Sequence, residues 1–152
     1  MILMKLESAE LKHIEKIVAI SKAAFDSDIN VGAPEAGGPP SYESITWHSQ
    51  MKIEGHLLQV AMDEEIVGGA ILFVDEDGKT LYIGRIFLDP VLYRKGYGLS
   101  LMKMVETFYP GIKTIKLDTP LWNVRTNAFY KKLGYCEVKR DEEFIYYQKE
   151  LD

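Results

Sequence analysis

The spacing of apolar residues divides the chain into predicted helices and strands. Apolar positions recur at helical spacing over residues 11–25, which predicts an amphipathic helix with Ser8 as its N-cap. A short strand is predicted before it, over residues 1–6. A second helix is predicted over residues 44–54 and ends at Gly55, a residue that readily takes the left-handed conformation found after helices.

The middle of the chain changes to runs that are typical of β-strands. Residues 56–62, 66–74 and 81–88 are apolar and are separated by short polar segments, which predicts an antiparallel meander. The remaining predicted elements are a helix at 98–109, a strand at 112–117, a helix at 124–133 and strands at 135–138 and 144–149. This order, βααβββαβαββ, predicts a mixed sheet covered by helices on its faces.

One connection stands apart from this regular pattern. Residues 26–42, DSDINVGAPEAGGPPSY, join the first two predicted helices and are rich in glycine and proline. A connection of this length is more often functional than passive. We therefore predict a loop that contributes to a binding site.

Composition and charge narrow the function classes. The 152 residues, 47% hydrophobic and 27% charged, predict one soluble domain over 1–152. A net charge of −5 argues against broad nucleic-acid binding, which needs a basic face. The lone Cys136 and three histidines without ligand spacing predict no metal site and favour a reducing cytoplasm. The first apolar run is broken at Lys5, too early for a signal peptide or membrane span.

A candidate anion site lies where the third strand of the meander leads into a helix. Residues 89–99, DPVLYRKGYGL, place Gly96 and Gly98 at the helix start, where backbone N–H groups converge and the helix dipole adds about half a positive charge. The spacing fits neither a P-loop nor a dinucleotide-binding turn. A pyrophosphate cradle is one interpretation. The other is a plain strand-to-helix turn in which the glycines only permit tight geometry.

A second motif follows in residues 117–135, LDTPLWNVRTNAFYKKLGY. Together the two segments resemble the general N-acetyltransferase (GNAT) superfamily. That family has a QxxGxG-type turn, here 93–98, then an N-x6-Y helix, here 123–130, and a K-L-G-F/Y ending, here 132–135. Tyr93 departs from the Gln or Arg that is usual at the first turn position.

The resemblance implies a fold and a co-substrate. The fold would be α+β, a three-layer mixed GNAT-like arrangement whose central sheet of about seven strands splays between the fourth and fifth strands. The co-substrate would be acetyl-CoA, with its pantetheine arm in the splay and its pyrophosphate at the glycine turn. The implied cofactor-binding residues are Ile86, Phe87, Leu88, Arg94, Lys95, Gly96, Tyr97, Gly98 and Asn123.

The resemblance also implies an acetyltransferase that modifies a primary amine of a small molecule or peptide by direct attack. Such an amine, with a pKa near 10.4, must lose a proton before it attacks, and Asp118 is the candidate base. Tyr130 is the candidate acid beside the departing sulfur. The alternatives are that Asp118 only stabilises the Asp-Thr-Pro turn and that Tyr130 is an aromatic core residue.

The acceptor pocket is expected beside the long loop. Tyr42, Trp47 and His48 are the candidate substrate contacts, and the alternative is a packed tryptophan with an exposed histidine. A second function class stays open, a non-catalytic acyl-CoA sensor or interaction module that retains the turn without turnover. The family resemblance also leaves a homodimer open.

Overall fold

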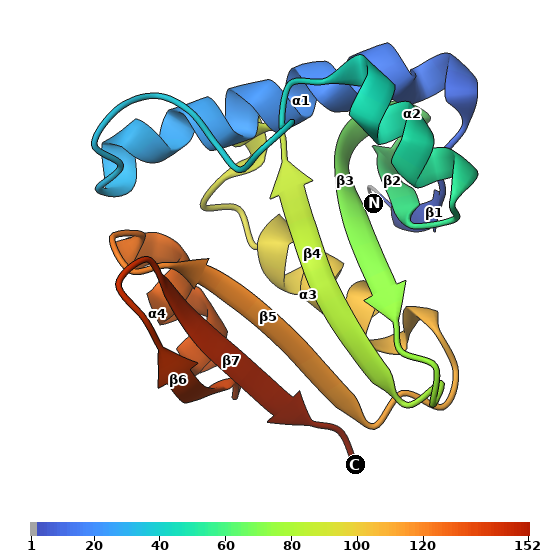
Figure 1. The fold of residues 1–152 in the computed structure, drawn as a ribbon. Helices are drawn as coiled ribbons and strands as arrows, with labels where there is room; N and C mark the ends of the chain where they lie inside the picture. Colours follow the sequence, from blue (N-terminus) through green and yellow to red (C-terminus); the bar gives the residue numbers. More distant parts are fainter. Residues whose placement is uncertain (1–2) are drawn as a thin grey trace.

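The computed structural model describes residues 3–152 and has the predicted order of elements (Figure 1). The strands are β1 (Met4–Ser8), β2 (Leu57–Met62), β3 (Glu65–Val74), β4 (Thr80–Leu88), β5 (Thr114–Pro120), β6 (Cys136–Arg140) and β7 (Phe144–Glu150). The helices are α1 (Ile14–Asp26), α2 (Ile45–Ile53), α3 (Tyr97–Phe108) and α4 (Val124–Lys132), with 3-10 turns η1 (Leu11–His13), η2 (Ser27–Val31) and η3 (Pro90–Leu92).

All seven strands form one mixed sheet in the order β1-β2-β3-β4-β5-β7-β6. Every neighbouring pair is antiparallel except β4 and β5, which run parallel. Residues 80–82 of β4 pair with residues 114–116 of β5, and beyond them the two strands separate (Figure 1). The predicted GNAT-like fold, including the splay between the fourth and fifth strands, is confirmed.

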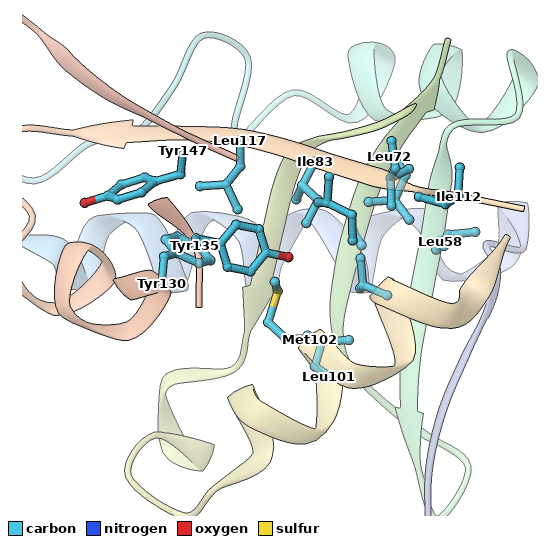
Figure 2. Close-up of a cluster of buried hydrophobic side chains, with 14 of the residues drawn as sticks. Leu58, Leu72, Ile83, Leu101, Met102, Ile112, Leu117, Tyr130, Tyr135 and Tyr147 are labelled. Carbon is cyan, nitrogen blue, oxygen red and sulfur yellow. The ribbon is translucent and has the colours of Figure 1, made fainter. Parts of the chain in front are cut away.

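The helices cover both faces of the sheet and enclose two hydrophobic cores. Helix α1 packs on one face against Leu57, Ile71 and Phe87 of the strands. Helices α3 and α4 cover the other face, where Tyr130, Tyr135 and Tyr147 gather beside Leu117 and Met102 (Figure 2). Strand β2, between β1 and β3, is buried along its whole length, because its residues contribute to the cores on both faces of the sheet.

The start of the first helix differs from the prediction. Ser8 is the last residue of β1 and pairs with Leu58, so it is not a helix cap. The antiparallel ladder with β2 holds the backbone extended through Ser8, and α1 begins only at Ile14 after the η1 turn. Leu11, which fits the helical stripe by spacing, is 63% exposed. The first two residues of the strand predicted over 1–6 lie outside the described residues.

Two other boundaries move in ways that affect the candidate site. Strand β5 continues past Leu117 to Pro120, so Asp118 lies inside a strand that pairs with β7. The loop predicted over residues 26–42 begins with the last residue of α1 and then the η2 turn. Gly32, in the left-handed conformation, ends that turn. Helix α2 and its end at Gly55 agree with the prediction, and Ser44 caps this helix by accepting a hydrogen bond from the backbone N–H of Trp47.

We expect Tyr147→Phe to destabilise the fold. The Tyr147 hydroxyl donates a 2.6 Å hydrogen bond to Oδ1 of the buried Asn127, and its removal leaves that oxygen unpaired. The expected loss is about 1–3 kcal/mol in the free energy of unfolding, measured by urea denaturation. The adjacent Tyr146→Phe is the control, because the Tyr146 hydroxyl bonds Asp141 at an exposed position. Equal losses in the two variants would contradict a stabilising role of the buried pair.

Candidate functional site

The splay between β4 and β5 opens into two cavities that meet. One, of about 480 Å³, lies on the side of α1 and the loop after it, and the other, of about 770 Å³, lies beside the glycine turn and α3. The residues that line both cavities come from β4, the turn and α4, and they include Ile86, Phe87, Tyr93, Arg125 and Tyr130. The first is called the loop-side cavity below and the second the turn-side cavity.

The glycine turn leads into α3 in the geometry that an anion cradle needs. Gly96 is the N-cap of α3 with φ +83°, a left-handed conformation that glycine adopts without steric cost. Backbone N–H groups in the first turn of a helix have no partner within it and carry the positive end of the dipole. Arg94, Gly96 and Gly98 line the turn-side cavity together with residues 86–88, whereas Lys95 and Tyr97 line neither cavity.

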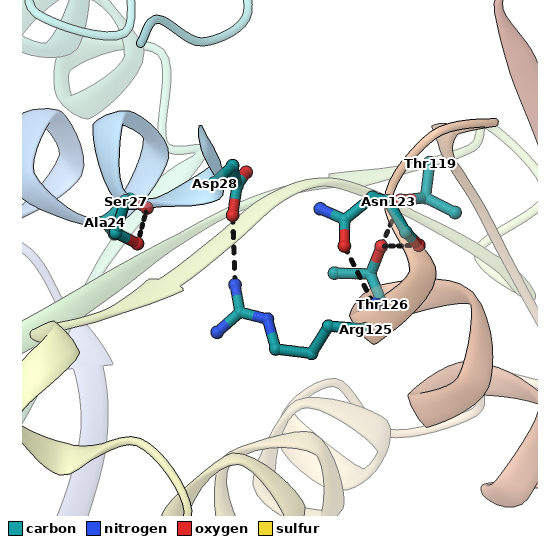
Figure 3. Close-up of polar contacts among 7 residues, drawn as sticks. All are labelled: Ala24, Ser27, Asp28, Thr119, Asn123, Arg125 and Thr126. Atoms are coloured by element: carbon teal, nitrogen blue, oxygen red, sulfur yellow. Dashed lines mark hydrogen bonds and ion pairs between the residues drawn. The ribbon is translucent and has the colours of Figure 1, made fainter. Parts of the chain in front are cut away.

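A polar bridge crosses the cleft between the two cavities. Arg125 of α4 donates from Nη2 to Oδ1 of Asp28, at 3.0 Å, and Asp28 lies in η2 after the first helix (Figure 3). The guanidinium also lies over the ring of Tyr93, 4.3 Å from its centre. Burial raises the pKa of Asp28, while Arg125 lowers it. Tyr93, the departure from the family turn, therefore supports this arginine with its aromatic face.

Asp118 projects from β5 into the loop-side cavity. The hydroxyl of Tyr82, on β4, donates a hydrogen bond to Oδ2 of Asp118. This contact joins β4 and β5 close to their last paired residues. Burial raises the pKa of Tyr82 most, and the hydrogen bond to Asp118 raises it further. The carboxylate is therefore held in place by a neutral donor rather than by a cation.

Tyr130 lies where the two cavities meet, on α4. It is 6% exposed, and its ring packs against Phe129 and Tyr135. Burial raises its pKa, the charge of Arg125 lowers it, and the charge of Asp118 raises it again. The net shift is upward, so the hydroxyl keeps its proton through the neutral range and can act as a hydrogen-bond donor.

Asn123 has a structural role at the start of α4. It is 2% exposed, and its Oδ1 accepts a 3.0 Å hydrogen bond from the backbone N–H of Thr126, which caps the helix (Figure 3). The hydroxyl of Thr126 in turn lies 2.6 Å from that of Thr119 on β5. These contacts attach the start of α4, which carries Arg125, to the strand that carries Asp118.

None of the three predicted acceptor residues lines the loop-side cavity. The loop after η2 lines it, but Tyr42 bonds Asp26 through its hydroxyl, and neither Tyr42 nor Trp47 lines either cavity. His48 is fully buried beside Phe87, and burial lowers its pKa, so the ring is neutral. The exposed histidine considered as an alternative is not observed.

The candidates predicted from the sequence do not include Asp28 and Arg85, which line the loop-side cavity, or Tyr82, which bonds Asp118. Arg85 has a visible signal, because it is a charge inside the otherwise apolar strand run LYIGRIFL. Asp28 has none, since its partner Arg125 is 97 residues away in the sequence. In the described part of the chain no group of acidic, histidine or cysteine side chains could hold a metal ion, and none of its helices has the length and apolarity to cross a membrane.

Comparison with known proteins places this geometry in a family. A profile of the acetyltransferase (GNAT) family matches residues 22–135. The chain belongs to this family. No curated protein matches the sequence significantly.

Several acetyltransferase structures share the fold at low sequence identity. The PaiA N-acetyltransferase of Thermoplasma acidophilum, solved with coenzyme A, is 16% identical with a TM-score of 0.84, over 98% of this chain and 99% of that one. A GNAT-family acetyltransferase of Streptococcus agalactiae is 17% identical with a TM-score of 0.83, over 98% and 96%. The ribosomal-protein-S18-alanine N-acetyltransferase of Escherichia coli is 18% identical with a TM-score of 0.71, over 99% and 95%.

We expect Gly96→Ala to destabilise the turn that leads into α3. An added Cβ at this position meets no atom within 4 Å, so the cost comes from the left-handed φ alone and amounts to about 1 kcal/mol. Gly98→Ala is the control, because its Cβ would make only an ordinary 3.6 Å contact with the ring of Phe129. Urea denaturation of both variants measures the difference, and an equal or larger loss in Gly98→Ala would be evidence against this account.

Proposed function

We propose that this chain is an acetyl-CoA-dependent N-acetyltransferase that transfers the acetyl group to a primary amine of a small molecule or peptide by direct attack. The observation that carries the proposal is the meeting of two cavities at Tyr130. One cavity has the features of a pyrophosphate site, and the other contains a carboxylate, Asp118. A donor and an acceptor that enter from opposite sides would meet between them.

The turn-side cavity fits acetyl-CoA. The first turn of α3 begins at the cavity with Gly96 and Gly98 in its lining, which suits the pyrophosphate. Residues 86–88 of β4 pair with β3 on one side, and β5 has separated from them on the other. Their main chain on that side suits the amides of a pantetheine arm. Bound there, the co-substrate supplies an acetyl thioester.

Tyr130 and Asp118 would manage the protons. The raised pKa of Tyr130 keeps its hydroxyl protonated, so it can donate a hydrogen bond to the sulfur as negative charge develops there. Asp118, held through Oδ2 by Tyr82, would accept the proton of the acceptor amine directly or through water. Asn123 would act by capping α4 and thereby positioning Tyr130.

Amine acceptors are consistent with the family. The Escherichia coli protein of the same fold is named for the acetylation of an alanine of ribosomal protein S18, and the Thermoplasma protein is named as an N-acetyltransferase. The cytoplasm is the compartment that we propose, because the exposed Cys136 is the chain's single cysteine and a free thiol persists there.

We expect Tyr130→Phe to lower kcat about a hundredfold or more while acetyl-CoA affinity changes little, because only the hydroxyl is removed. Thiol release is measured with a panel of primary amines, and acetyl-CoA affinity by calorimetry. Tyr135→Phe is the control, since Tyr135 is equally buried but bonds Glu106 and lines neither cavity. Unchanged turnover in Tyr130→Phe would exclude Tyr130 as the acid. A parent protein that binds acetyl-CoA without amine-dependent thiol release would be a sensor.

We expect Asp118→Asn to lower kcat/KM for the amine about a hundredfold with no change in acetyl-CoA affinity, since the amide cannot accept the amine proton. Glu137→Gln, an exposed carboxylate paired with Arg140, serves as the matched control. If Asp118→Asn lost stability but kept kcat/KM, Asp118 would only stabilise the strand end.

A further inference from the structure

Arg85 is the one cation in the lining of the loop-side cavity that lacks a carboxylate partner among the described residues. Arg125 is paired with Asp28, whereas no ion pair of residues 3–152 includes Arg85. Its Nη2 donates to the backbone oxygen of Pro40 in the long loop, and its Nη1 is buried with no hydrogen-bond partner. One arm of the guanidinium is therefore satisfied and the other is not.

The surroundings of Arg85 make the unpaired Nη1 energetically costly when no ligand is bound. The guanidinium lies over the ring of Trp47, 4.2 Å from its centre, and burial lowers its pKa to about 10. It still carries its charge at neutral pH. Burial lowers the pKa of the nearby His48, so this ring adds no second positive charge. A desolvated cation with an unpaired donor gains more from an anionic partner than a cation in water does.

The opposite wall of the same cavity has the opposite charge. Asp118 projects from β5, and Arg85 lies on β4, on the other side of the splay. The Asp118 carboxylate bonds a neutral tyrosine rather than a cation, so its charge also remains available. A molecule that bridges the cavity thus meets a carboxylate near Tyr130 and a guanidinium across from it.

We propose that the acceptor is a small amino-carboxylate, with its amine toward Asp118 and Tyr130 and its carboxylate paired with Arg85. This proposal rests on the proposed function for the site and names its substrate class. A free small molecule fits better than a folded protein, because the cavity holds about 480 Å³ and residues 33–40 of the loop form part of its wall. Arg85 is the specificity residue, and Trp47 positions it by stacking.

The test compares each standard L-amino acid that has a primary amine with the amine that lacks only its α-carboxylate. Lysine is thus paired with cadaverine, and phenylalanine with 2-phenylethylamine. Binding to the full chain saturated with CoA is measured by calorimetry, and kcat/KM is measured by thiol release. We expect at least one amino acid to exceed its matched amine about tenfold to a hundredfold in both measurements.

Arg85→Gln should remove that preference. Binding and kcat/KM of the amino acid should fall, while those of the matched amine should stay nearly unchanged. Arg85→Lys should retain part of the preference, because lysine keeps the positive charge but cannot bond a carboxylate through two parallel N–H groups as a guanidinium does. Arg140→Gln removes the same charge at an exposed site paired with Glu137, and it should leave the preference intact.

The outcomes separate this inference from the proposed function. The inference is overturned if no amino acid exceeds its matched amine, or if Arg85→Gln weakens both members alike, as it would if Arg85 only held the loop through Pro40. Binding that depends on the carboxylate and on Arg85, without turnover of any amine, would support the inference and overturn the proposed function. Turnover of amines without a preference for the carboxylate would support the proposed function and overturn the inference.

Discussion

The limited pairing of β4 with β5 is the constraint on which the site depends. The strands pair over residues 80–82 and 114–116 and then separate, yet neither strand is left without support. β4 continues its ladder with β3, and β5 continues with β7. Each strand is therefore held by its outer neighbour, while the main-chain groups of its inner edge remain available. Since buried main-chain groups need partners, an opening of this kind is suited to a ligand that supplies them.

The polar contacts around the cleft connect elements that are far apart in the sequence. The bridge from Asp28 through Arg125 to Tyr93 joins η2, α4 and the glycine turn, and it lies between the two cavities. Burying this ion pair is costly, as the raised pKa of Asp28 indicates, and Arg125 offsets only part of that cost. A contact of this kind is better understood as fixing the relative position of three elements than as a source of stability.

The charged side chains of the loop-side cavity are also only partly neutralised by one another. Asp28 and Arg125 neutralise one another, and Asp118 is held by a hydroxyl. Arg85 is stacked on Trp47 and donates a hydrogen bond to a backbone oxygen. These contacts define its position, but they do not neutralise its charge. The lining of the loop-side cavity therefore has one cation without a carboxylate partner, Arg85, and two carboxylates without a cationic partner, Asp118 and Glu35, among the described residues.

The sequence by itself determined the order of the elements, the glycine turn at the start of α3 and the position of Tyr130 on α4, because these depend on local periodicity and on residue types at short spacing. The family resemblance added the splay. Tertiary structure alone decided that Ser8 ends a strand and that His48 is buried. It also decided that Asp28 and Arg85 line the cavity and that Tyr82 bonds Asp118. These features depend on pairing between strands and on contacts across the cleft, and such contacts leave no periodic signal along the chain.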